Sequence, residues 1–151
     1  MIMIEGVQIQ ALKKIADERG SIMHMMRADD KIFTKFGEIY FATAYPGVVK
    51  GWHIHREQEQ NYVVVKGMIK LVIYDIRKDS KTYRKIEEIF MGDLDYKIVK
   101  IPPGVANGWK CIGTETAILA NLSDLPHVAG EMDRIDPLSK EIPYNWNIVF
   151  K

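Results

Sequence analysis

The chain of 151 residues is long enough for one domain with a sizeable hydrophobic core. Apolar residues make up 47% of it and charged residues 27%, a balance typical of folded globular proteins and contrary to intrinsic disorder. The formal net charge is +1, and basic residues are interspersed with acidic ones, so no surface for nucleic acid is indicated.

The sequence also predicts a soluble protein of the cytoplasm. The start, MIMIEGVQIQ, lacks the basic region and the long apolar stretch of a signal peptide. No apolar run approaches the roughly 18 residues of a membrane span. The single cysteine, Cys111, excludes an intrachain disulfide and suits a reducing compartment.

Short segments rich in Val, Ile, Tyr and Phe recur along the chain, separated by turn signals such as ERGS, YPG, RKDSKT and PPG. Only 28–36 has the pattern of a short helical turn. Many short strands at this spacing predict an all-β sandwich, jelly roll or barrel, and we expect one domain over 1–151. The predicted strands lie, in chain order, at 7–12, 21–26, 38–45, 48–55, 61–66, 68–76, 83–90, 96–101, 105–111 and 115–122.

The stretch 48–67, VVKGWHIHREQEQNYVVVKG, has the densest set of chemically active side chains. Because side chains alternate along a strand, His53 and His55 are expected on one face, and Lys50 and Trp52 on the other. In a small barrel, two inward histidines lie in a pocket. A structural role is the alternative for each histidine.

The spacing from Gly47 through His53, His55 and Glu59 to Gly67 resembles the first motif of the cupin superfamily. The second cupin motif is similar to PPGVAN, except that Asn107 stands where the histidine belongs. This resemblance implies a double-stranded β-helix, a jelly-roll barrel of two antiparallel sheets. No cofactor is expected, because the third imidazole is missing; a bound metal would use His53, His55 and Glu59.

Within the cupins, four fragments resemble the dTDP-4-dehydrorhamnose 3,5-epimerase family in their order: ADERGSI, GVVKGWHIH, IPPGVANGW and DRIDPLSKEIPYNW. The resemblance covers 17–146. It implies an enzyme that acts on a nucleotide-linked 4-keto-6-deoxyhexose in deoxysugar or polysaccharide biosynthesis, and we expect a homodimer.

The resemblance assigns roles to four residues. It places His53 at the catalytic base and Asp136 at the aspartate paired with it. Arg19 and Lys50 fall on positions near the nucleotide diphosphate. For Asp136 and Arg19, a role in a local turn is the alternative.

Other positions depart from the family. Gln60 stands at the position of the catalytic lysine, and no tyrosine occurs in LSDLPHV, where the family has its acid. His127 is the candidate replacement for that acid. Asn107 and Trp109 complete the candidate substrate-binding residues, with a core position as the alternative for Trp109.

The stretch GWHIHREQEQ also resembles a motif of a second cupin family, the sugar-nucleotide 3,4-ketoisomerases. These enzymes move a ketone between neighbouring carbons. Both reactions remove a proton beside a ketone. A histidine suits that step, because its ordinary pKa lies near 6.5. Gln60, Asn107 and His55 are candidate donors to the enolate oxygen. A ketoisomerase, and a cupin that binds a nucleotide sugar without catalysis, therefore stay open as alternatives.

Overall fold

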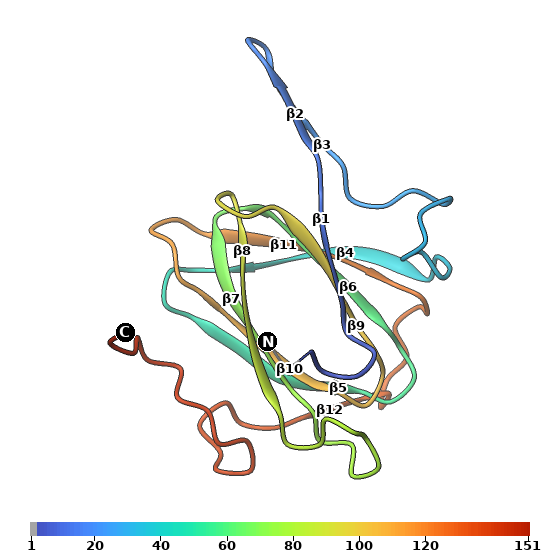
Figure 1. The fold of residues 1–151 in the computed structure, drawn as a ribbon, viewed down its shortest axis with the longest axis vertical. Helices are drawn as coiled ribbons and strands as arrows, with labels where there is room; N and C mark the ends of the chain where they lie inside the picture. The colour runs from blue at the N-terminus through green and yellow to red at the C-terminus, as the bar shows by residue number, and fades with distance from the viewer. Residues whose placement is uncertain (1–2) are drawn as a thin grey trace.

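The computed structural model describes residues 3–151, which form two five-stranded antiparallel sheets and one separate hairpin (Figure 1). The first sheet has the order β1-β9-β6-β11-β4, the second has the order β12-β5-β10-β7-β8, and β2 pairs with β3. The strands are β1 (Gln8–Ala11), β2 (Lys14–Asp17), β3 (Gly20–Met23), β4 (Glu38–Ala44), β5 (Val49–His55), β6 (Gln60–Lys66), β7 (Met68–Tyr74), β8 (Ile86–Gly92), β9 (Lys97–Ile101), β10 (Ala106–Cys111), β11 (Ala117–Ser123) and β12 (Met132–Arg134).

All ten predicted strands are confirmed, and their sheets form the expected jelly roll. Two short strands were not predicted. The side chains of β2 are exposed throughout, and β12 is a polar segment of 3 residues that exists through its pairing with β5. Residues 28–36 form turns rather than a helix. The described part of the chain holds no helix long and apolar enough to cross a membrane.

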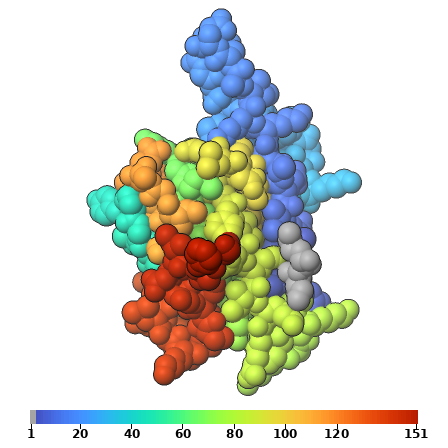
Figure 2. Space-filling view, turned by 60° about the vertical axis from the view of Figure 1, so that its left-hand side comes forward, coloured from blue at the N-terminus to red at the C-terminus, as the bar shows by residue number. Residues whose placement is uncertain are grey.

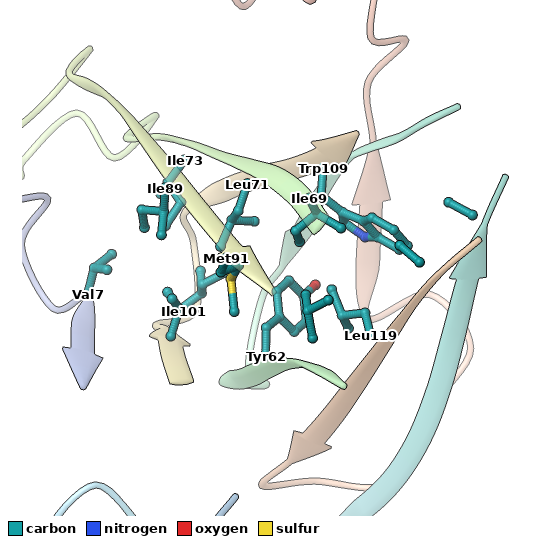
Figure 3. Close-up of a cluster of buried hydrophobic side chains, with 14 of the residues drawn as sticks. Val7, Tyr62, Ile69, Leu71, Ile73, Ile89, Met91, Ile101, Trp109 and Leu119 are labelled. Carbon is teal, nitrogen blue, oxygen red and sulfur yellow. The ribbon is translucent and has the colours of Figure 1, made fainter. Parts of the chain in front are cut away.

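The main hydrophobic core lies between the two sheets (Figure 3). Alternate residues of the strands point into it, as Ile69, Leu71 and Ile73 do from β7, because successive side chains of a strand face opposite ways. Tyr62, Trp109 and Leu119 lie together at one end of this core (Figure 3). That end of the barrel also carries polar side chains, and it contains the site described below.

Two segments lie outside the barrel. The hairpin β2–β3 projects from one end of it, as the blue segment at the top of Figure 2 shows. The C-terminal segment packs on the outer face of the second sheet, where Trp146 lies 5.0 Å from Trp52 between ring centroids. This packing buries Trp52 completely on the face opposite to the core.

Candidate active site

A cavity of about 460 Å³ opens between the two sheets at the end of the core marked by Tyr62 and Trp109. Strands of both sheets contribute to its wall, which mixes aromatic, aliphatic and basic side chains. The lining residues are Tyr40, Ala42, Val49, Lys50, Gly51, His53, His55, Tyr62, Trp109, Leu119, Met132 and Arg134.

The two histidines of β5 both line this cavity, as the strand alternation predicted. The prediction for Lys50 was wrong, because Lys50 lines the cavity as well. The pairing of β5 with β10 shifts register between Asn107 and Trp109: His53 faces Asn107, while Lys50 faces Trp109. This bulge inserts one extra residue into β5 and turns Lys50 to the same side as His53.

A glycine at position 51 permits the bulge. Its φ is +156°, and a Cβ atom there would meet the Cα of Gly108 at 2.6 Å. The two backbones therefore lie too close for any larger residue. The Lys50 Nζ lies 5.8 Å from the ring centroid of Trp109, within the range of a cation–π contact.

His53 is held in its neutral form. Burial, followed by the charges of Arg134, His55 and Lys50, lowers its pKa from 6.5 to about 4. Arg134 is its direct neighbour across the pairing of β12 with β5. Within residues 3–151, neither nitrogen of the His53 ring has a hydrogen-bond partner. A neutral imidazole with a free nitrogen is available as a base.

His55 has a different environment. Its Nδ1 lies 2.7 Å from Oε1 of Glu131, and both side chains are nearly buried. Burial pushes the pKa of Glu131 up, but hydrogen bonds from the Glu57 backbone, the His55 ring and the Gln58 backbone outweigh it, so the pKa is lowered. The anionic carboxylate therefore keeps a proton on Nδ1 of His55 and directs Nε2 away from itself.

The amides predicted at this site differ in what they can offer a ligand. Asn107 accepts a hydrogen bond from the Tyr62 hydroxyl at 3.1 Å, and its buried Nδ2 has no partner among residues 3–151. Gln60 is buried and does not line the cavity. Its amide is engaged by Gln58 and Asn121 instead.

Besides Gln60 and Asn107, three further predicted residues lie apart from the cavity lining. Asp136 is exposed, and its carboxylate accepts the backbone N–H of Leu138 at 2.7 Å, so no hydrogen bond joins it to His53 among the described residues. Its role as the partner of His53 stays a prediction. Arg19 lies at the tip of the projecting hairpin, paired with Asp17. His127 is exposed on a loop.

The alternative metal ligands are not assembled. Glu59 Oε1 lies 3.2 Å from Lys100 Nζ, and Lys100 is the register partner of Asn61. Tyr62 points into the core, so its neighbour Asn61 points away from it. The ion pair therefore lies on the outer face of β6, whereas the two histidines line the cavity between the sheets. Within residues 3–151, no group of three or more His, Cys, Asp or Glu side chains is placed to hold a metal ion.

Four polar residues of the site were not predicted from the sequence: Glu131, Arg134, Tyr40 and Tyr62. Glu131 and Arg134 reach the site because β12 pairs with β5. This pairing brings together residues that are far apart in the sequence: His55 and Glu131 are separated by 76 positions. Tyr40 occupies a position of β4 that the alternation of EIYFATAY assigns to one face together with Ala42. This alternation is the sequence signal that could have identified Tyr40 as a cavity residue.

Comparisons with known proteins identify the family of this chain. A sequence model of the dTDP-4-dehydrorhamnose 3,5-epimerase family matches residues 1–151. The spore coat polysaccharide biosynthesis protein SpsL of Bacillus subtilis is 31% identical over 99% of this chain and 100% of its own length. The probable low-salt glycan biosynthesis epimerase Agl13 of Haloferax volcanii is 33% identical over 94% of this chain and 89% of its own.

A solved structure extends the likeness to three dimensions. The crystal structure of a dTDP sugar isomerase from Desulfovibrio desulfuricans superposes with a TM-score of 0.93 at 36% identity, and the match covers 97% of this chain and 95% of that chain. The sequence match, the relatives and the superposition all extend over nearly the whole chain. The protein therefore belongs to the dTDP-4-dehydrorhamnose 3,5-epimerase family.

Proposed function

We propose that the protein epimerises a nucleotide-linked 4-keto-6-deoxyhexose, and that His53 removes the proton beside the ketone. The observation that carries this proposal is the neutral, unpaired imidazole of His53 in a cavity lined from both sheets. Membership of an epimerase family supports the same reaction class. The product would enter deoxysugar or polysaccharide biosynthesis, as the names of the relatives suggest.

The chemistry fits the environment of the two histidines. A carbon beside a ketone is a weak acid, so its deprotonation needs a positioned base and a donor for the enolate oxygen. His53 supplies the base, a contribution of roughly 10²- to 10⁴-fold. Nε2 of a neutral His55 whose proton is held on Nδ1 by Glu131 can only accept a hydrogen bond, so the unpaired Nδ2 of Asn107, the register partner of His53, is the candidate donor to the enolate oxygen.

The diphosphate of the substrate requires cations near the cavity. Lys50 and Arg134 line it and are the candidates within one chain. Arg19, which the family resemblance assigns to the diphosphate, lies in the turn between β2 and β3, the hairpin that projects from the barrel (Figure 1). In a homodimer, Arg19 of one copy of the chain could reach the cavity of the other copy.

A homodimer is supported by two exposed apolar features. Ile15 and Ile22 face each other across the hairpin and are 55% and 64% exposed. Strand β4 forms the edge of its sheet, and its Phe41 is 63% exposed. Exposed sheet edges and apolar patches of this kind are covered by partners in stable proteins. Light scattering should give a dimer mass, and Ile22→Asp should shift it to the monomer; a monomeric wild type contradicts this part of the proposal.

A 3,4-ketoisomerase is the second candidate, because His53 and His55 line the same wall of the cavity and could shuttle protons along one face of the sugar. We expect either activity in the cytoplasm, where Cys111 stays reduced.

The deciding experiment incubates the purified protein with dTDP- and GDP-linked 4-keto-6-deoxyglucose in deuterated water and follows the sugar by NMR. An epimerase incorporates deuterium beside the ketone and inverts the carbon. A ketoisomerase relocates the ketone. A binding protein takes up the nucleotide sugar without exchange, which would refute both enzymatic readings.

A further inference from the structure

The hydroxyl of Tyr40 is oriented by a chain of hydrogen bonds behind the cavity wall. Tyr40 lies on β4 and lines the cavity, and its register partner on β11 is Asn121. The Nδ2 of Asn121 lies 3.0 Å from the Tyr40 oxygen. The direction of this hydrogen bond decides where the hydroxyl proton of Tyr40 points.

The direction is fixed by the backbone. The Oδ1 of Asn121 accepts the backbone N–H of Asn61 at 3.1 Å, and an N–H group can only donate. The amide of Asn121 therefore carries its two N–H groups on the other side. One of them donates to Tyr40, and the other donates to Oε1 of Gln60.

The hydrogen bonds at the far end of this hydrogen-bonded chain run in the same direction. Gln60 donates through Nε2 to Oε1 of Gln58 at 3.2 Å. Gln58 in turn donates through Nε2 to the carbonyl of Pro126 at 3.1 Å, and a carbonyl can only accept. Both ends thus impose one direction on every bond between them.

It follows that the oxygen of Tyr40 is an acceptor in this chain, and its proton must be donated elsewhere. No acceptor for that proton occurs within residues 3–151. The side chain lines the cavity, so the free O–H group is available to a ligand there. Strand β4 belongs to the first sheet and β5 to the second, so Tyr40 and His53 reach the cavity from two different sheets.

We propose that Tyr40 is the acid that protonates the inverted carbon on the face of the sugar opposite to His53, a proposal that rests on the epimerase function above. His53 takes the proton from the carbon, and the electron pair of the C–H bond moves to the carbonyl oxygen as an enolate. The enolate then forms a new C–H bond with the Tyr40 proton, and the O–H electron pair stays on the phenolate. Water returns the proton from the His53 imidazolium to Tyr40.

The other groups that could fill this role are placed less well. Tyr62 donates its proton to Asn107, and burial raises its pKa. His127 is exposed and does not line the cavity. In this account Gln60 and Asn121 are positioning residues: they hold the oxygen of Tyr40, and the Nδ2–H of Asn121 still donates to it after the proton has left.

The test compares wild type, Tyr40→Phe and the surface control Tyr45→Phe in deuterated water with dTDP-4-keto-6-deoxyglucose. Wild type and Tyr45→Phe should exchange and invert. Tyr40→Phe should still exchange the proton next to His53 with retention, while inversion falls by about 10²-fold or more. Binding of dTDP, measured by calorimetry, should stay within about threefold, which also shows that the variant is folded.

Two results would overturn the proposal. Inversion by Tyr40→Phe within about threefold of wild type assigns the acid to another group. Loss of both exchange and inversion, with dTDP binding unchanged, assigns Tyr40 to the enolate oxygen rather than to the carbon. A wild type that binds dTDP but exchanges nothing would instead refute the proposed function itself.

Discussion

The depressed pKa of His53 predicts an unusual pH profile for deuterium exchange. A base must be unprotonated to act, so the rate follows the neutral fraction of His53. With a pKa of about 4, about 97% of the side chain is neutral at about pH 5.5, whereas a histidine with its ordinary pKa of 6.5 would be about 9% neutral. The wild type should therefore keep nearly its full kcat/KM at about pH 5.5.

The same reasoning identifies the cause of the shift. After burial, Arg134 is the largest contributor to the low pKa of His53. Arg134→Gln should move the acid limb of the exchange rate upward, towards 6.5, and Arg27→Gln, on an exposed distant segment, should not. Each profile is normalised to its own plateau, so weaker substrate binding does not imitate the shift. A wild-type midpoint near 6.5, or an unmoved midpoint in Arg134→Gln, refutes the reasoning.

Two further predictions concern stability. Both carboxylate oxygens of Glu87 are buried without a partner among residues 3–151, and burial raises its pKa, so the folded state binds more protons than the unfolded state and loses stability as pH rises through that pKa. Glu87→Gln should remove this loss, so in urea unfolding the variant should gain stability over wild type as the pH rises above the ordinary carboxylate range; equal pH dependence in both proteins would contradict it. Gly51→Ala should lower the free energy of unfolding by about 1–3 kcal/mol because its Cβ would meet Gly108, whereas Gly113→Ala, with its nearest contact at 3.6 Å, should change it little; equal effects of the two would show that the bulge tolerates a side chain.

The strands were predictable because their period and turn residues are local signals. The pairing of His53 and His55 on one face followed from the alternation in GWHIH alone. Lys50 was misplaced for a specific reason: the bulge at Gly51 depends on the approach of Gly108 from β10, which no local pattern encodes.

The electrostatics of the site could not be predicted in the same way. The pairing of β12 with β5 brings Glu131 to His55 and Arg134 to His53, and β12 has neither apolar alternation nor length. The family resemblance drew attention to Asp136 a few residues later. In the structure the Asp136 carboxylate closes a turn instead, because β12 ends at Arg134. Tertiary pairing, rather than sequence spacing, selected the neighbours of each histidine.

The most direct test of the central claim is deuterium incorporation by His53→Asn, with His127→Asn as the matched control. His53 lines the cavity, whereas His127 is an exposed loop residue. We predict that His53→Asn lowers exchange beside the ketone by about 10²- to 10⁴-fold, with dTDP affinity unchanged, and that His127→Asn exchanges at the wild-type rate. Exchange by His53→Asn within a few-fold of wild type would show that another residue is the base.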